Sequence, residues 1–153
     1  MKRLFISVLF FAMLGGTGQA AEITVPYQKA KSGALLNVPI MIDKADNLAG
    51  VKLVINFDKE ILKFKEGNTT PSTRSLMNVI NDKIPGRLIV VMAGAKGISG
   101  KDLTLLVLTF EVKANMAAER STKLDIVETQ LMTDQLKEVK AGVIVKPFDI
   151  VPQ

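Results

Sequence analysis

The amino-acid sequence contains no cysteine and no histidine. Without cysteine the chain forms no disulfide and carries no lipid-anchored cysteine. The lack of both residues also excludes Ser-His and Cys-His nucleophile pairs and the usual zinc ligand sets. A glycosidase needs only two carboxyl groups, and the chain has 15 acidic residues, but such side chains are mostly exposed in folded proteins. We therefore expect a protein that is not an enzyme and that has no cofactor.

Aromatic residues are scarce as well. There is no Trp, and three of the seven Phe residues fall within the first 20 positions. The aromatic residues that remain are Tyr27, Phe57, Phe64, Phe110 and Phe148. Sugar faces are usually held on exposed aromatic platforms, and Phe57 and Phe110 occupy inward positions of their expected strands. Sugar binding would therefore depend on polar loops, and it is kept as an alternative.

The charged residues form neither a calcium loop nor a basic stripe. No D-x-[DN]-x-[DN]-G loop ending in Glu is present, and Asp43 with Asp46 lacks further oxygen ligands at the required spacing. The Lys and Arg residues are scattered singly, without the clustering and interleaved aromatics of a nucleic-acid groove. We expect no metal site and no nucleic-acid partner.

The N-terminus has the pattern of a secretory signal peptide over residues 1–20. Lys2 and Arg3 precede an apolar run from Leu4 to Leu14, which is interrupted only by Ser7 and is followed by small residues. This run is too short to span a bilayer, and no later segment reaches the roughly 18 apolar residues of a membrane helix. We expect cleavage near Ala20/Ala21, secretion to the periplasm or the extracellular space, and no membrane span. The mature chain would carry a net charge of about +3, because two of the 20 basic residues are removed and none of the 15 acidic ones.

Apolar residues alternate with polar ones along several segments of residues 21–153, which we expect to form a single domain. Three segments keep one face apolar over four positions: Leu36, Val38, Ile40 and Ile42; Val51, Leu53, Ile55 and Phe57; and Leu106, Leu108, Phe110 and Val112. About nine segments rich in apolar or β-branched residues, MNVIN (77–81) among them, are separated by Gly, Pro, Asn, Asp and Ser clusters. They predict an all-β chain that folds as an antiparallel β-sandwich. The expected core covers about residues 23–146, and residues 147–153 are expected to form a short tail.

Several of these segments, taken in order, resemble a cohesin domain. The matching pieces are Val38-Pro39-Ile40, NLAGVKLVINFDKEILKF (47–64), PGRLIVVMAGA (85–95), LLVLTFEVKA (105–114) and AGVIV (141–145). The resemblance covers about residues 23–146. It implies a nine-stranded sandwich with jelly-roll topology that binds a small partner module, the dockerin, through one sheet face. In cellulosomes this pairing attaches polysaccharide-degrading enzymes to a scaffold. Here a single copy occurs without a catalytic module, and the missing calcium loop indicates that the chain is the receiving half.

The resemblance also indicates where a partner would bind. It implies that Leu88, Val90 and Met92 point inward and that Ile89 and Val91 point out of the sandwich, beside Val54 of a neighbouring strand. Apolar patches with a polar rim often mark protein interaction sites. A preference of β-branched residues for strands would give the same pattern. The candidate partner-binding residues are Lys52, Val54, Asn56, Arg87, Ile89, Val91, Asp125 and Val127, with Lys123 nearby.

We therefore expect a secreted, non-catalytic module that recognises a dockerin-like or other secreted protein. One alternative is an accessory module of polysaccharide degradation that binds a polysaccharide. Another is a subunit of a secretion or surface apparatus, which would use the same patch for contacts between copies of the chain.

Overall fold

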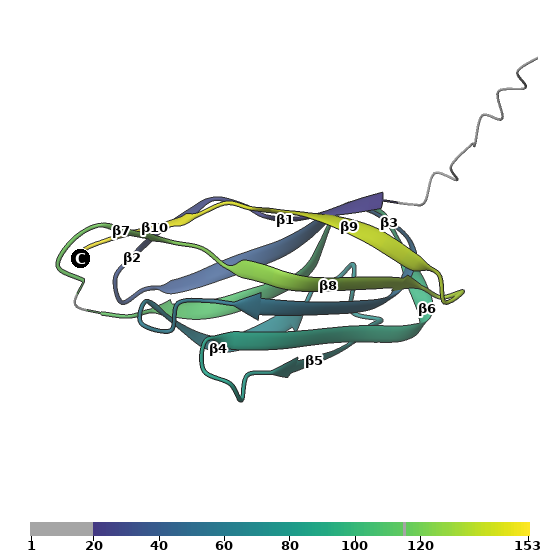
Figure 1. Cartoon of the computed structure of the whole chain (residues 1–153), viewed down its shortest axis with the longest axis horizontal. Helices are drawn as coiled ribbons and strands as arrows, with labels where there is room; N and C mark the ends of the chain where they lie inside the picture. The colour runs from purple at the N-terminus through teal and green to yellow at the C-terminus, as the bar shows by residue number, and fades with distance from the viewer. Residues whose placement is uncertain (1–19, 115) are drawn as a thin grey trace, which may run out of the picture.

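The computed structural model describes residues 20–114 and 116–153, and in these residues it contains ten strands and no helix (Figure 1). The expected signal peptide lies outside the described residues, except for Ala20. The strands are β1 (Ala20–Val25), β2 (Gln28–Lys31), β3 (Leu35–Asn56), β4 (Leu62–Thr69), β5 (Met77–Asn81), β6 (Arg87–Val112), β7 (Arg120–Thr122), β8 (Asp125–Thr133), β9 (Glu138–Val145) and β10 (Phe148–Val151).

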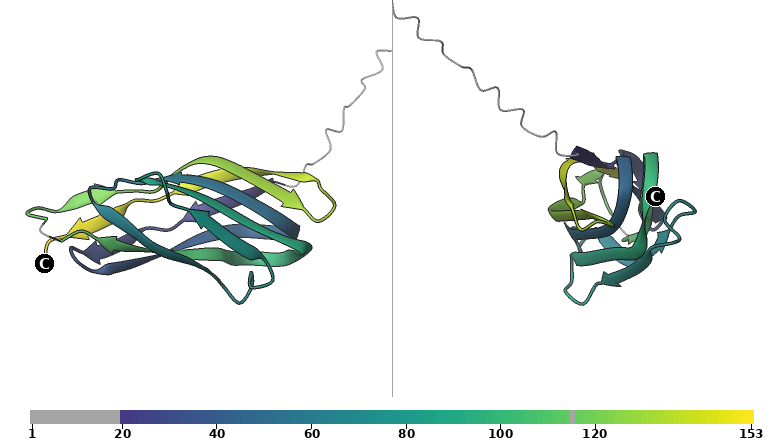
Figure 2. Two further views of the ribbon diagram at one scale, coloured as in Figure 1. Left: turned by 90° about the horizontal axis from the view of Figure 1, so that it is seen from below. Right: turned by 90° about the vertical axis from the view of Figure 1, so that its right-hand side faces the viewer.

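Two long strands, β3 with 22 residues and β6 with 26, pair with each other along most of their length. Residues 50–56 of β3 lie between β8 and residues 87–93 of β6, and β5 extends this front sheet in the order β8-β3-β6-β5. The first part of β3 and the last part of β6 form the back sheet, in the order β1-β3-β6-β4. β9 pairs with both β8 and β1 and so joins the two sheets along one side. Figure 2 shows the resulting elongated sandwich from below and end-on.

The two long strands change layers at a shared bend. The β3 register shifts between Ala45 and Leu48 and again before Gly50, and Asn47 has a positive φ of 52°. Gly97 of β6 packs so tightly here that a Cβ atom would come within 2.2 Å of the Asn47 backbone carbon. Only glycine permits this approach, and the bend lets one strand supply residues to both sheets.

The expected inward faces are confirmed. The four residues of each periodic segment at the start of β3 and the end of β6 are buried: Leu36, Val38, Ile40, Ile42, Leu106, Leu108, Phe110 and Val112. Leu88, Val90 and Met92 are fully buried as well. Alternation identifies these faces because successive strand residues point to opposite sides of a sheet. In the segment at the end of β3, Val51, Leu53 and Ile55 are buried, whereas Phe57 lies just beyond the strand and is only half-buried against the core.

Strand number and the C-terminus differ from the expectation. Four of the nine expected segments merge into β3 and β6, and three short strands, β2, β7 and β10, form an additional sheet. Most pairings are antiparallel, but β1–β9 and β2–β10 are parallel. The expected tail is wrong for residues 148–151, because Phe148 and Ile150 are completely buried in the core. Pro147 and Pro152 flank this strand and hide its short alternating pattern, because proline usually marks a strand end.

Candidate functional site

The outer side of the front sheet, which we call the front face, brings together most of the sequence-predicted site residues. In the β3–β6 ladder Lys52 lies opposite Val91, Val54 opposite Ile89, and Asn56 opposite Arg87. Directly opposed residues of an antiparallel pair project to the same side. Leu53 and Ile55 point into the core, so these three pairs lie on the outward side. The expected adjacency of the two strands on one sheet is thus present.

Val54 differs from its expected role because it is buried, with only 1% of its surface exposed. It lies directly between Ile89 on β6 and Glu128 on β8, and it is absent from the hydrophobic core cluster. A residue on a central strand is covered by larger neighbours on both sides, and sequence alternation does not report this. Val54 forms the floor of the front face, and the expectation that it is exposed is wrong.

The exposed apolar surface is centred on β5 and β6. Met77 and Val79 of β5 are 73% and 57% exposed, and they lie opposite Ala93 and Val91 of β6. Val91 is 40% exposed. We call Met77, Val79, Ile89, Val91 and Ala93 the apolar strip. Sequence reasoning identified the MNVIN segment as a strand but missed its part in the site. Alternation places Met77 and Val79 on one side of this segment and Ile80 on the other, but only the packing of Ile80 against the core shows which side is exposed.

β8 supplies a polar border on the other side of β3. Glu128 forms an ion pair with Lys52, with 3.3 Å between Oε1 and Nζ, and Asp125 lies opposite Asn56. Val127 is 52% exposed, but it falls at the register shift between Ile126 and Glu128 and is separated from the apolar strip by β3. The expected single patch is therefore divided into an apolar strip and a polar border that also carries Val127.

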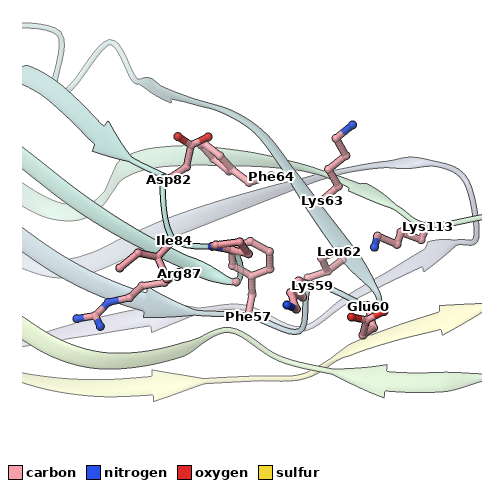
Figure 3. Close-up of a pocket in the computed structure, with 12 residues that line it drawn as sticks. Phe57, Lys59, Glu60, Leu62, Lys63, Phe64, Asp82, Ile84, Arg87 and Lys113 are labelled. Carbon is pink, nitrogen blue, oxygen red and sulfur yellow. The ribbon is translucent and has the colours of Figure 1, made fainter.

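An open pocket of about 410 Å³ adjoins the front face at the end of β3, and Figure 3 shows its side chains. The Phe57 and Phe64 rings line it and pack edge-to-face on buried Phe110, at centroid distances of 5.2 and 5.8 Å. The Phe57 amide donates a hydrogen bond of 2.9 Å to the Gly86 carbonyl, which fixes the loop before β6. Gly86 has a φ of 77°, a value that favours glycine. Arg87, the next residue, lines the pocket and also lies on the front face.

The described residues offer little for metal or proton-transfer chemistry. No group of three or more potential metal-ligating side chains lies together in residues 20–114 and 116–153. The pKa of Tyr27 is raised, chiefly by its hydrogen bond to the Asp149 carboxylate, but Tyr27 precedes β2, away from the front sheet. Within the described part of the chain, no helix is long and apolar enough to cross a membrane. What the front face offers is a preformed apolar surface with a charged border.

Comparisons with known proteins agree with this arrangement. The family model for the cohesin domain matches residues 21–146. The non-cellulosomal cohesin of the archaeon Archaeoglobus fulgidus is 21% identical, covers 86% of this chain and 91% of its own, and gives a TM-score of 0.76. A cohesin from a type I cohesin–dockerin complex of Clostridium thermocellum is 14% identical, with coverages of 90% and 97% and a TM-score of 0.78. The cohesin module of a Clostridium perfringens family 33 glycoside hydrolase is 13% identical, with coverages of 89% and 98% and a TM-score of 0.73.

The solved structures confirm the expected jelly-roll β-sandwich, because modules with that fold superpose on most of the chain. No curated protein sequence matches it. The family match extends from β1 to the residue after β9 and includes every strand of the front sheet. The chain therefore belongs to the cohesin domain family.

Proposed function

We propose that the protein is a non-catalytic module that binds a dockerin-like protein through the front face. The observation that carries this proposal is the apolar strip, in which Met77, Val79 and Val91 are exposed side by side on two paired strands. Exposed apolar patches rimmed by polar groups are typical of protein interaction sites. Solved cohesins of the same fold were crystallised in complexes with dockerins, which favours a partner of that class.

The front face is suited to rigid docking. Its strands are held by ladders on both sides of β3, which on the β8 side are interrupted by the register shift at Val127. Binding therefore requires little ordering of the backbone, and preorganisation of this kind favours affinity. Burial of the apolar strip would provide most of the binding free energy. The border residues Lys52, Asn56, Arg87 and Asp125 would set orientation and association rate.

Secretion is part of the proposal. The positive start and the apolar run of residues 1–20 have the composition of a signal peptide. A dockerin-like partner exported by the same cell would meet the module outside the cytoplasm. N-terminal sequencing of the exported protein tests this, and cleavage near Ala20/Ala21 is the expected result.

A capture experiment tests the binding proposal. Residues 20–153 are immobilised, exposed to secreted and periplasmic proteins of the source organism with calcium, and eluted with a chelator. We expect a calcium-dependent protein with paired D-x-[DN]-x-[DN]-G loops. A Val91→Asp column should lose it, whereas a Val143→Asp column should retain it. Val143 is a matched control, because it is 37% exposed, close to the 40% of Val91, but lies on β9 outside the front sheet. Equal retention on both columns would contradict the site.

The two alternatives have separate readouts. Polysaccharide binding gains little support from the described aromatic residues, because Phe110 and Phe148 are buried, Phe57 and Phe64 are half-buried, and Tyr27 alone is exposed, at 49%. Binding of the intact domain to soluble polysaccharides, with an empty chelator eluate, would favour that alternative. A mass in solution that rises with protein concentration would favour contacts between copies of the chain, as in a surface apparatus.

A further inference from the structure

The pocket at the end of β3 has a preformed apolar wall. It lies between residues 57–64 and the loop at 82–87, and its apolar side chains include Phe57, Leu62, Phe64 and Ile84. Figure 3 shows the Phe57 ring among these side chains, with charged side chains around them. Because Phe110 holds both Phe rings in place, the wall does not have to form when a ligand enters. Its volume of about 410 Å³ is in the range that accommodates a small ligand or a few side chains.

The charges around this pocket favour an anion. Its basic lining residues are Lys59, Lys63, Arg87 and Lys113, and its acidic ones are Glu60 and Asp82. Among the described residues none of these six forms an ion pair. The local excess of positive charge therefore attracts a negatively charged group.

Arg87 supplies an independent observation. Its Nε atom is shielded from solvent and has no hydrogen-bond partner in the described residues. Buried polar atoms are normally paired, so a rotation of the half-buried Arg87 side chain that brings this donor to an acceptor from another molecule would be favoured. Arg87 also lines a second hollow of about 220 Å³ with Asn81, Lys83, Ile84 and Ile89. The two hollows share Ile84 and Arg87, and we call them together the end pocket.

We propose that the end pocket anchors an acidic segment of the partner protein, which places a carboxylate at Arg87 and an apolar side chain against Phe57 and Phe64. The inference rests on the proposed function, because the same partner would occupy the front face. Arg87 lies opposite Asn56 on that face and Ile89 opposite Val54, so a partner seated on the apolar strip continues directly into the end pocket. An acidic sugar carries the same charge, but the half-buried Phe57 and Phe64 provide no exposed platform for its ring.

A short peptide tests the pocket without the natural partner. Amide signals of residues 20–153 are followed by NMR during titration with an acetylated Glu-Phe-Glu peptide. A Gln-Phe-Gln peptide and trigalacturonate serve as comparisons. We expect shifts confined to residues 57–64, 81–89 and 113, with a dissociation constant of about 1 mM for the acidic peptide and about tenfold weaker binding of the amide peptide. Equal binding of the two peptides, or shifts elsewhere, would overturn the proposal. Tighter binding of trigalacturonate at the same signals would replace it with a sugar site.

Substitutions in the chain test whether binding of the acidic peptide depends on the positive charges of the end pocket. Arg87→Gln should weaken the acidic peptide about tenfold, and the double variant Lys59→Gln/Lys63→Gln should also weaken it. Lys140→Gln on β9 makes the same charge change outside the pocket and should leave binding unchanged. If Arg87→Gln fails to fold, the double variant carries the test, because Lys59 and Lys63 are exposed. Unchanged binding by the double variant would contradict the proposal.

The capture experiment separates this inference from the proposed function. Lys59 and Lys63 lie outside the front sheet, so the double variant alters the end pocket and leaves the apolar strip intact. We expect the double variant to retain less partner than the wild-type column under equal washing. If the double variant retains all of the partner and Val91→Asp loses it, the front face is supported as the binding site and the anchoring role of the end pocket is refuted. Retention by Val91→Asp would instead refute the front face.

Discussion

Lys52 Nζ and Glu128 Oε1 lie 3.3 Å apart and join β3 to β8 diagonally across the front face. Lys52 lies opposite Gln130, and Glu128 lies opposite Val54, two residues further along β3. The two side chains are 40% and 51% exposed, so water and salt screen their attraction. The pair therefore borders the apolar strip without contributing much to folding.

We predict that Lys52→Gln lowers the free energy of unfolding by less than about 1 kcal/mol, because exposed ion pairs contribute little. Urea denaturation would measure this. Its main effect should be on association with the partner, with a slower on-rate and a weaker dependence on salt. The variant Lys140→Gln, on β9, provides the comparison for the same charge change. A loss of several kcal/mol in the Lys52 variant would show that solvent screens the pair poorly.

Val54→Asp should destabilise the domain by several kcal/mol, because it buries a carboxylate with no cationic partner directly opposite it. The same substitution at Val79, which is 57% exposed on β5, should change stability by less than about 0.5 kcal/mol. Thermal melting of both variants would measure the difference. A Val54→Asp domain with an unchanged melting temperature would show that Val54 is accessible in solution.

Phe148→Ala should cost about 3–5 kcal/mol, because it removes a fully buried ring from a strand near the end of the chain. Val151→Ala in the same strand truncates a half-buried side chain and should cost less than about 1.5 kcal/mol. Chemical denaturation would measure the loss in free energy of unfolding for each of the two variants. Similar small costs for both would mean that β10 is only loosely attached.

Tyr27 is the single tyrosine of the chain, and its titration tests the contact between Tyr27 and Asp149 of β10. Its hydroxyl donates a 2.7 Å hydrogen bond to Asp149 Oδ2, and this bond, followed by burial and the charges of Asp149 and Glu119, raises the pKa of Tyr27. Asp149→Asn should move the pKa back toward the ordinary tyrosine value. A raised pKa means that any contribution of this bond to stability is present below the ordinary pKa and is lost as pH rises through the raised one. Ultraviolet titration of the phenol measures the shift, and identical curves for both proteins would contradict the assignment.

Alternation alone was sufficient to predict the core faces. Leu36 to Ile42 and Leu106 to Val112 have one face against the core, and burial of one face imposes a period of two on the sequence. The merging of segments into β3 and β6 could not be predicted, because the bend at Asn47 and Gly97 depends on a close approach between distant residues. β10 was missed because it is only four residues long.

The pairing of the strands that carry the candidate residues was predicted better than the exposure of those residues. The resemblance correctly placed Ile89 and Val91 beside β3. It did not reveal that neighbours on both sides bury Val54, since exposure of an outward residue depends on the size of the side chains opposite it. Met77 and Val79 were overlooked because their importance follows from the pairing of β5 with β6. The end pocket depends on how loop 82–86 packs on Phe57, which no local pattern encodes.

The two parallel pairings also determine how the domain bears tension. The described chain begins and ends at opposite ends of its long axis (Figure 1). β1 pairs with β9, and β10 with β2, along that axis, so a pull on the two ends would slide each terminal strand along its partner. Sliding loads all hydrogen bonds of a ladder at once, whereas peeling breaks them one at a time. The parallel pairings of β1 and β10 therefore predict high resistance to a pull applied along the long axis of the domain.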